Sequence, residues 1–288
     1  MTAGLIAPAP LAPGQRVEVI APAGPFDADA FARGVARLRA RYIVTHAPDV
    51  LERAGFLAGT DDRRATELLR AIEDDEVHAI VAARGGYGAT RILDRVPTEL
   101  VARHPKLLVG FSDVTALHAV WARAGVGSLH APMVAALGDA PESLVARWMR
   151  AVEGAPTSAI TELEAIAPGT AHGPLLGGNL AVLTALLGTP HALPIAGAIL
   201  FLEDIDERPY RVDRMLTTWR QTGALSQVAG IALGSFVRCE PGTDGVTVRD
   251  VLAERLGNLG VPVVAGIQAG HVDDNLELPL GATLTLDA

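Results

Sequence analysis

Three polar residues directly follow segments whose apolar composition is typical of buried strands. Ser112 comes after residues 107–111, Glu203 after 198–202, and His271 shortly after 262–267. In an open α/β sheet, ligands bind at the carboxyl ends of the strands, so these positions favour chemistry. A hydroxyl, an imidazole and a carboxylate are the groups that a serine hydrolase needs: the histidine takes the proton of the serine, and the acid orients the imidazole.

Each of the three residues also has a simpler interpretation. Ser112 stands between a strand-like and a helix-like segment, as a nucleophile in a sharp turn would, and the Asp113 amide could then face a developing oxyanion. However, GFSDV lacks the second glycine of the G-x-S-x-G pattern, and the serine could simply cap the helix. Glu203 alone could be a solvated loop acid, and His271 an ordinary loop histidine.

A glycine-rich segment, RGGYG at residues 84–88, follows another apolar run. Glycines at the end of a strand let backbone amides approach an anion, which could be a phosphate or a tetrahedral oxyanion. The segment lacks both the GxGxxG spacing and the lysine of a phosphate loop. It could therefore supply an oxyanion donor beside Ser112, or it could be only a tight turn between a strand and a helix.

The composition excludes several classes of function. The chain has 288 residues, of which 24 are basic and 33 acidic, for a formal net charge of -9. This balance, without a basic run, argues against a nucleic acid or an anionic membrane as partner and leaves small molecules. The single cysteine, Cys239, excludes an internal disulfide and favours the cytoplasm. The single lysine, Lys106, suits neither a phosphate loop nor a Schiff base, and no metal-binding spacing of Cys or His is present.

Two apolar stretches could be mistaken for a membrane-spanning helix and a signal peptide. Residues 165–202 contain no Asp, Glu, Lys or Arg, but Gly and Pro divide them into pieces of about ten residues, shorter than the ~20 that a spanning helix needs. We interpret this stretch as buried core. Residues 1–14 carry three prolines and no basic residue, so we expect no signal peptide.

The order of the segments predicts the fold class and the domains. In the first half, apolar strands alternate with helices, one of which begins at Thr60 as its N-cap, and this alternation predicts a parallel sheet covered by helices on both sides. The periodicity is lost around residues 141–172. We therefore predict an α/β protein with an N-terminal α/β domain at residues 1–150 and a second domain at 151–288.

The second domain differs from the first in its predicted secondary structure. We expect it to be mixed α/β with β-rich portions, because apolar strands occur beside two well-signalled helices. One helix begins at Asn179, and the other begins at Thr247 with Asp250 as its capping-box partner.

Six segments resemble those of the serine-type LD-carboxypeptidases and the related microcin-immunity peptidases, in the same order. They are FLAGTDDRRATELLRAI (56–72), AARGGYGATRILD (82–94), PKLLVGFSDVTALH (105–118), GPLLGGNLAVLTALLGTP (173–190), AILFLEDIDERPYRVDRMLTTW (198–219) and GIQAGHVDDNLELPLGA (266–282). The resemblance implies an N-terminal domain with the nucleophile, a C-terminal domain with the acid and the base, and an active site between them. By position it implies Ser112 as nucleophile, Glu203 and His271 as the rest of a triad, and the amides of Gly86 and Asp113 as an oxyanion hole. It also implies that no metal or other cofactor is used and that the protein forms a homodimer.

We expect a cytoplasmic serine carboxypeptidase that hydrolyses the amide between an L-configured centre and a terminal D-amino acid, as in murein tetrapeptide. The first alternative is a microcin-immunity-type peptidase that hydrolyses an aminoacyl or peptidyl nucleotide amide. The second is a non-catalytic module that binds a phosphate or nucleotide through the glycine-rich segment. In each case the expected partner is a small molecule, with no nucleic acid and no membrane.

Overall fold

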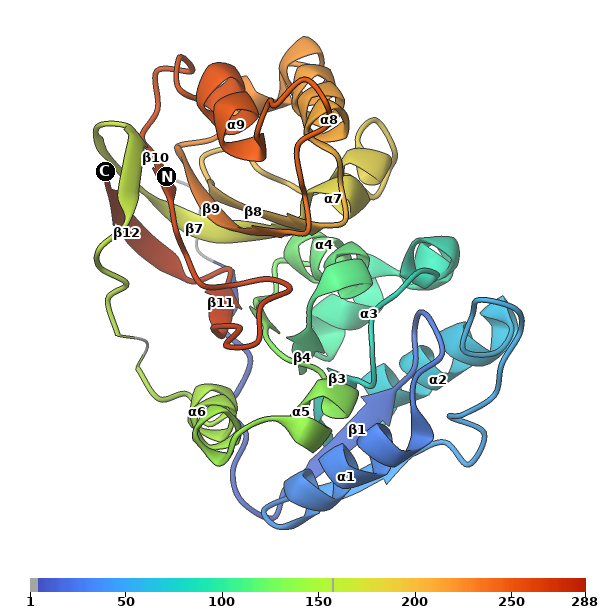
Figure 1. Cartoon of the computed structure of the whole chain (residues 1–288). Helices are drawn as coiled ribbons and strands as arrows, with labels where there is room; N and C mark the ends of the chain where they lie inside the picture. The colour runs from blue at the N-terminus through green and yellow to red at the C-terminus, as the bar shows by residue number, and fades with distance from the viewer. Residues whose placement is uncertain (1–4, 157) are drawn as a thin grey trace. The chain divides into compact units, whose positions relative to one another are not determined.

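The computed structural model describes residues 5–156 and 158–288, which form two compact units (Figure 1). The N-terminal unit holds the described part of residues 6–157 together with 277–279, and the C-terminal unit holds the other described residues. Both units combine a sheet with helices, so the predicted α/β class is confirmed. The predicted domains meet at residue 150, whereas the units divide near 157, and a short C-terminal segment belongs to the N-terminal unit. The strand in this segment pairs with a strand that is distant in the sequence, and hydrophobic periodicity cannot reveal such a pairing.

The sheet of the N-terminal unit has six strands in the order β11-β5-β4-β3-β1-β2. They are β1 (Arg16–Ile20), β2 (Ile43–His46), β3 (Val77–Ala82), β4 (Leu107–Gly110), β5 (Ser128–His130) and β11 (Leu278–Leu280). The pairs β2-β1, β1-β3, β3-β4 and β4-β5 are all parallel, as predicted. The carboxyl ends of β3 and β4 therefore lie at one edge, where the glycine-rich segment and Ser112 follow them.

Helices cover this sheet because its strands are apolar on both faces. The helices are α1 (Ala28–Arg39), α2 (Asp61–Glu73), α3 (Thr98–Arg103), α4 (Thr115–Arg123), α5 (Val134–Asp139) and α6 (Glu142–Val152), with 3-10 helices η1 (Ala89–Arg95) and η2 (Ser112–Val114). Val17 and Val19 of β1 share a hydrophobic cluster with Phe31 of α1 and Trp148 of α6. Ile20 is also fully buried, which fixes the strand end from both sides.

The C-terminal unit contains a mixed six-stranded sheet in the order β12-β7-β8-β9-β10-β6. Its strands are β6 (Glu164–Ala167), β7 (Thr170–Asn179), β8 (Ile199–Ile205), β9 (Gly230–Val237), β10 (Val263–Ala265) and β12 (Thr283–Asp287); its helices are α7 (Leu180–Leu186), α8 (Pro209–Gln221) and α9 (Val248–Leu256), with a 3-10 helix η3 (Ala224–Gln227). The central strands β7 to β10 are parallel, and β12 and β6 pair antiparallel at the two edges. The expectation of a mixed α/β unit with β-rich portions is confirmed, and the mixture of parallel and antiparallel pairing within its sheet was not predicted.

The predicted helix starts agree with the structure. The Thr60 side chain accepts a hydrogen bond from the Arg63 amide, and Asn179 accepts one from the Val182 amide. Thr247 forms both halves of a capping box with its partner three residues later. The caps satisfy amides that a first helical turn leaves without partners, which is why short polar residues mark these positions in the sequence.

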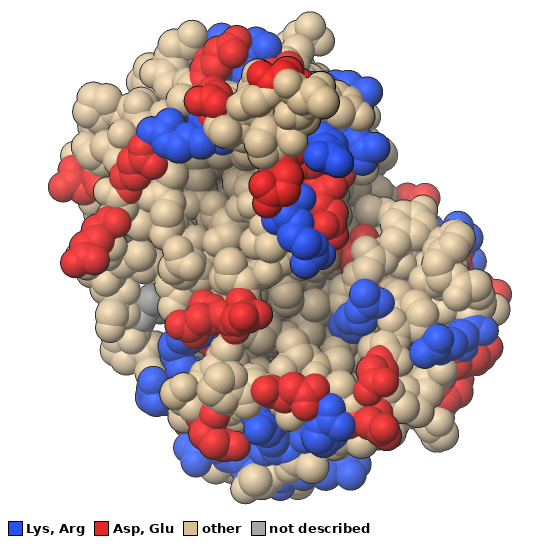
Figure 2. Space-filling model, viewed as in Figure 1, with Lys and Arg blue, Asp and Glu red and all other residues tan. Residues whose placement is uncertain are grey.

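The apolar stretch around residues 165–202 divides between β6, β7, α7 and β8, as its glycines and prolines predict. Over the part of the chain that the structure describes, no helix is both long and apolar enough to cross a membrane. Basic and acidic side chains are interspersed on the face that Figure 2 shows. Several of the described basic residues form ion pairs with acidic ones, such as Arg33 with Asp139.

Candidate active site

Ser112 lies just beyond β4 in a left-handed backbone conformation, with φ of 62°. Such a conformation costs a non-glycine residue about 1–3 kcal/mol and is found where the surrounding structure enforces it, often at functional sites. The one-turn helix η2 leads from Ser112 into α4. This sequence of strand, strained turn and helix is the geometry expected of a nucleophile. A serine that caps a helix has an extended backbone instead, so the capping alternative does not describe Ser112.

The glycine-rich segment packs directly against this turn. A Cβ atom placed on Gly85 would lie 2.9 Å from the Ser112 Cβ and 3.0 Å from its Oγ, closer than side chains pack. On the other side, the Gly24 amide donates to the Gly85 carbonyl at 3.0 Å. Gly86 has a φ of 108°, which favours glycine. The segment is thus more than a connecting turn, because its glycines allow backbone to approach the serine.

The Asp113 side chain is buried and turned toward the end of the same segment. Its Oδ2 accepts a hydrogen bond from the Ala89 amide at 2.7 Å. Burial raises the pKa of Asp113 to about 6, and the amides of Gly88 and Ala89 and the charge of Arg64 oppose that rise. The sequence predicted a role for the backbone amide of Asp113, but its carboxyl group was not considered.

The predicted acid and base meet in the C-terminal unit. His271 Nδ1 lies 2.8 Å from Glu203 Oε2, and the Glu203 side chain is fully buried. Because a carboxylate only accepts, the imidazole donates through Nδ1, which leaves Nε2 as the basic nitrogen. The solvated alternative for Glu203 is excluded by its burial. Glu203 lies within β8, which continues to Ile205 instead of ending at residue 202 as predicted, and His271 lies in the loop after β10, 68 residues along the chain.

The loop that carries His271 is shaped for this contact. Gly270 has a φ of 117°, and a Cβ there would lie 2.7 Å from Glu203 Oε2. The Gly270 amide donates to the Asn275 side chain at 2.9 Å, which closes the loop around the histidine. A glycine immediately before the histidine is therefore required for the approach of the carboxylate.

Asp204, the residue after Glu203, anchors the start of α7. Its carboxylate accepts hydrogen bonds from the Asn179 side chain and the Ala181 amide, each at 2.9 Å, at the start of α7. A register irregularity in the pairing of β8 with β9 occurs between Leu202 and Asp204. Burial raises the pKa of Asp204 to about 6. Asp204 stands in a run of acids at residues 203–207, and nothing in that run distinguishes it; only the tertiary structure shows that it anchors a helix.

His118, on α4, is a packed and hydrogen-bonded residue of the N-terminal unit. Its ring contacts the Gly110 carbonyl through Nε2 at 2.9 Å and the Ser128 hydroxyl through Nδ1 at 2.8 Å. Burial lowers its pKa to about 4. The neutral ring therefore donates to the carbonyl two residues before Ser112 and helps to fix the end of β4.

The structure thus assembles two groups of predicted residues, each within one unit. The N-terminal unit holds Ser112, Asp113 and Gly86, and the C-terminal unit holds Glu203 and His271. Among the described residues, no group of three or more His, Cys, Asp or Glu is arranged to hold a metal ion.

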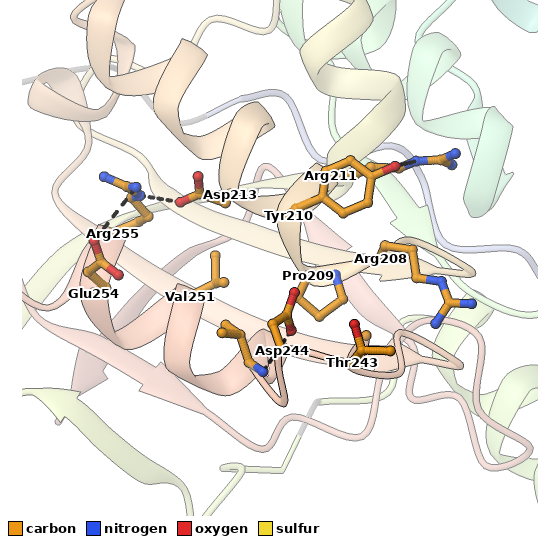
Figure 3. A pocket seen from close by; sticks show the side chains of 12 residues that line it. Arg208, Pro209, Tyr210, Arg211, Asp213, Thr243, Asp244, Val251, Glu254 and Arg255 are labelled. Atoms are coloured by element: carbon orange, nitrogen blue, oxygen red, sulfur yellow. Dashed lines mark hydrogen bonds and ion pairs between the residues drawn. The ribbon is translucent and has the colours of Figure 1, made fainter.

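The C-terminal unit also contains a cavity of about 570 Å³ (Figure 3). It lies between the start of α8, the loop around Asp244 and α9, and Arg255 is paired with Asp213 in its wall. None of the five predicted site residues lines it. Its charges are of both signs, so it gives no indication of a particular ligand.

Open α/β sheets of many functions carry their sites near the carboxyl ends of strands, so the fold alone does not identify the activity, but comparison with known proteins identifies the family. Residues 17–131 match the LD-carboxypeptidase N-terminal domain, and residues 172–286 match the LD-carboxypeptidase C-terminal domain. The chain belongs to the LD-carboxypeptidase family and is a peptidase. The predicted resemblance is confirmed.

Similar proteins of known sequence carry related names. A putative carboxypeptidase of Streptomyces coelicolor is 44% identical, over 99% of this chain and 94% of that protein. A probable murein peptide carboxypeptidase of Bacillus subtilis is 34% identical, over 97% of this chain and 91% of that protein.

Two solved structures share the fold over nearly the whole chain. The muramoyltetrapeptide carboxypeptidase of Oxalobacter formigenes has a TM-score of 0.85 and 30% identity, covering 95% of each chain. The microcin C7 self immunity protein has a TM-score of 0.85 and 23% identity, covering 98% of this chain and 96% of that one. At that identity the second likeness concerns the fold alone.

Proposed function

We propose that this protein is a serine-type LD-carboxypeptidase that removes the terminal D-amino acid from a murein-derived tetrapeptide. The observation that carries the proposal is the hydrogen bond of 2.8 Å between His271 and the buried Glu203. A histidine held in this way by a carboxylate is the base that an otherwise weak serine nucleophile requires. The names of the relatives from Bacillus subtilis and Oxalobacter formigenes support a murein peptide as the substrate.

In the proposed mechanism, Ser112 Oγ attacks the carbonyl carbon of the L-configured residue while His271 Nε2 takes its proton. Glu203 stabilises the resulting imidazolium through Nδ1. The Gly86 and Asp113 amides hold the oxyanion of the tetrahedral intermediate. The imidazolium then protonates the leaving nitrogen, the C–N bond breaks, and a D-amino acid departs. Water, deprotonated by the same imidazole, hydrolyses the acyl-serine and restores the enzyme.

The mechanism requires Ser112 Oγ to come within hydrogen-bonding reach of His271 Nε2 during catalysis, and this requirement makes it testable. The purified protein is given a tetrapeptide with terminal D-alanine, and released D-alanine is measured. We expect release by the wild type and a loss of at least about 10³-fold in Ser112→Ala. Ser226→Ala, which changes an exposed serine in the C-terminal unit, is the matched control. Undiminished release by a folded Ser112→Ala protein would refute the mechanism.

The same preparation distinguishes the alternatives. Faster turnover of an aminoacyl sulfamoyl adenylate than of the tetrapeptide would favour the microcin-immunity-type activity. Binding of phosphate or nucleotide, with no labelling of Ser112 by a fluorophosphonate, would favour the non-catalytic module. A tetrapeptide ending in L-alanine tests the configuration, and we expect it to be a poor substrate.

We also propose that the protein is cytoplasmic and forms a homodimer. The single cysteine supports the first, and family resemblance supports the second. Cell fractionation tests the location, and sedimentation of the purified protein tests the oligomeric state. We propose no metal or organic cofactor, so activity is expected to survive dialysis against a chelator.

A further inference from the structure

Two buried charged side chains bind the backbone at the end of the glycine-rich segment. Arg64, on α2, is fully buried. Its Nη1 donates to the Gly88 carbonyl at 2.7 Å and to the Pro22 carbonyl at 2.5 Å. A Cβ on Gly88 would lie 2.8 Å from the same Nη1, so this guanidinium occupies the space that a side chain would fill.

Asp113 binds the same point from the opposite side of the chain. Only 3% of the residue is exposed, and its carboxylate accepts the hydrogen bond from the Ala89 amide. Gly88 and Ala89 are consecutive, so one peptide region has its carbonyl held by Arg64 and its amides held by Asp113. The two side chains also attract each other electrostatically.

Stability alone does not explain this arrangement, because burying charged groups costs free energy. Removing a carboxylate and a guanidinium from water carries a penalty that their mutual attraction does not reliably offset, and apolar side chains of similar size often stabilise a protein at least as well. The hydrogen bonds instead fix one short segment, whose other end is held by the Gly24 amide on the Gly85 carbonyl. Gly85, at the held end, packs against Ser112, and Gly86 lies between the two held points.

We propose that Arg64 and Asp113 are positioning residues that hold residues 84–89 against the Ser112 turn, so that the backbone amides there are fixed before the oxyanion forms. This inference rests on the proposed function. Donors that are already oriented need no reorganisation during the reaction and stabilise charge that develops only in the transition state. Greater mobility of these backbone amides is therefore expected to lower kcat with little effect on KM.

The test compares variants of each residue with a control that is also structural. Asp113→Asn removes the charge at nearly constant size. Arg64→Met removes the Nη1 donor to both carbonyls together with the Nη2 ion pair to Asp61, and Arg64→Lys keeps a donor that can reach one carbonyl. Lys106→Met is the control, because Lys106 Nζ donates to the Asp74 and Val77 carbonyls at the opposite, amino end of β3. Thermal melting and circular dichroism establish that each variant is folded at the assay temperature.

We expect kcat for the tetrapeptide to fall about 10- to 100-fold in Asp113→Asn and Arg64→Met, with KM changed less than about threefold, because misplaced donors lose most of their effect. Arg64→Lys is expected to recover part of the loss. Phosphonylation of Ser112 by a fluorophosphonate forms a tetrahedral adduct at the same site, so its rate is expected to fall in parallel. Lys106→Met is expected to change stability without changing either rate.

Folded variants with kcat and labelling rates within about twofold of the wild type, or losses no larger than those of Lys106→Met, would overturn the inference. The labelling rate separates this outcome from a failure of the proposed function. If wild-type Ser112 is labelled but the tetrapeptide is not cleaved, the proposed substrate is wrong and the labelling rates still decide the role of Arg64 and Asp113. If wild-type Ser112 is not labelled, both proposals are wrong.

Discussion

Gly85 lies so close to Ser112 that a methyl group in place of its hydrogen would be 3.0 Å from the serine Oγ. The backbone at Gly85 is not left-handed, so alanine would be acceptable there except for this contact. The serine turn has little freedom to move aside, because its residues Asp113 and Val114 are buried. The geometry of the proposed nucleophile therefore depends on the absence of a side chain at Gly85, three residues after the end of β3, the strand that pairs with β4.

Gly85→Ala is expected to lower kcat for the tetrapeptide by about 100-fold, because a displacement near 1 Å at the reacting atom has effects of that order. Gly242→Ala is the matched control: its Cβ would meet only the Asp244 side chain at 3.5 Å or more, and its backbone is also not left-handed. Steady-state kinetics on both variants provide the measurement. Equal, near-wild-type rates would show that the Ser112 turn can adjust.

Gly270→Ala is expected to separate His271 from Glu203. The new Cβ would lie 2.7 Å from the Glu203 carboxylate, and φ of 117° is unfavourable for alanine. Gly266→Ala shares the backbone penalty, with φ of 100°, but its Cβ would meet only the Leu163 side chain at 3.9 Å. We expect both to lower the melting temperature and only Gly270→Ala to lower kcat more than about tenfold, as loss of an oriented base does. Similar kcat values for the two variants would contradict this.

The strained backbone of Ser112 predicts a difference between two inactive variants. Alanine keeps the steric penalty of a Cβ at φ of 62°, whereas glycine removes it. We expect Ser112→Gly to be more stable to unfolding by urea than Ser112→Ala by about 1 kcal/mol, after allowance for the greater freedom of glycine in the unfolded chain. Both variants are expected to lack peptidase activity. A less stable glycine variant would mean that the turn is not strained.

The residues that sequence reasoning found share a visible signal, and those that it missed do not. Ser112, Glu203 and His271 stand out because each is a polar residue that follows an apolar run, although β8 continues past Glu203 to Ile205. Arg64 follows another arginine in a charged helical turn, and nothing in that pattern distinguishes a fully buried guanidinium from a solvated one. Asp204 likewise looks solvated within a run of acids. Burial of a charge depends on which backbone groups the fold brings beside it.

Strand pairing shows the same limit on a larger scale. The alternation of segments predicted the parallel sheet of the N-terminal unit, since each apolar run needs two covered faces. It did not predict that β11, from the end of the chain, would join that sheet next to β5. Three residues of strand carry too little periodicity to show a partner, and only the folded chain defines the pairing.

The buried, neutral His118 is expected to make the folded protein less stable as pH falls. Its folded-state pKa of about 4 lies below the ordinary value of 6.5, so the unfolded chain binds a proton more readily between these pH values. The contribution of the neutral ring is present above pH 6.5 and is lost as pH falls toward 4, by up to about 3 kcal/mol. Urea unfolding of the wild type and His118→Gln at several pH values measures this. We expect the wild-type advantage at neutral pH to shrink on acidification, and a constant difference would contradict the assignment.

For Asp113 we expect the opposite dependence of folding stability on pH. Burial raises its folded-state pKa to about 6 from 3.8, so the folded protein binds the extra proton between these values and stability falls as pH rises through that range. Above pH 6 the ionised group destabilises the fold by up to about 3 kcal/mol relative to its neutral form, a cost that asparagine does not have. Urea unfolding is therefore expected to show Asp113→Asn gaining stability relative to the wild type between pH 4 and pH 7, while kcat at pH 7 is lower. A gain in stability with a loss of rate is typical of a charge retained for function, whereas parallel losses of both would indicate that Asp113 serves the fold.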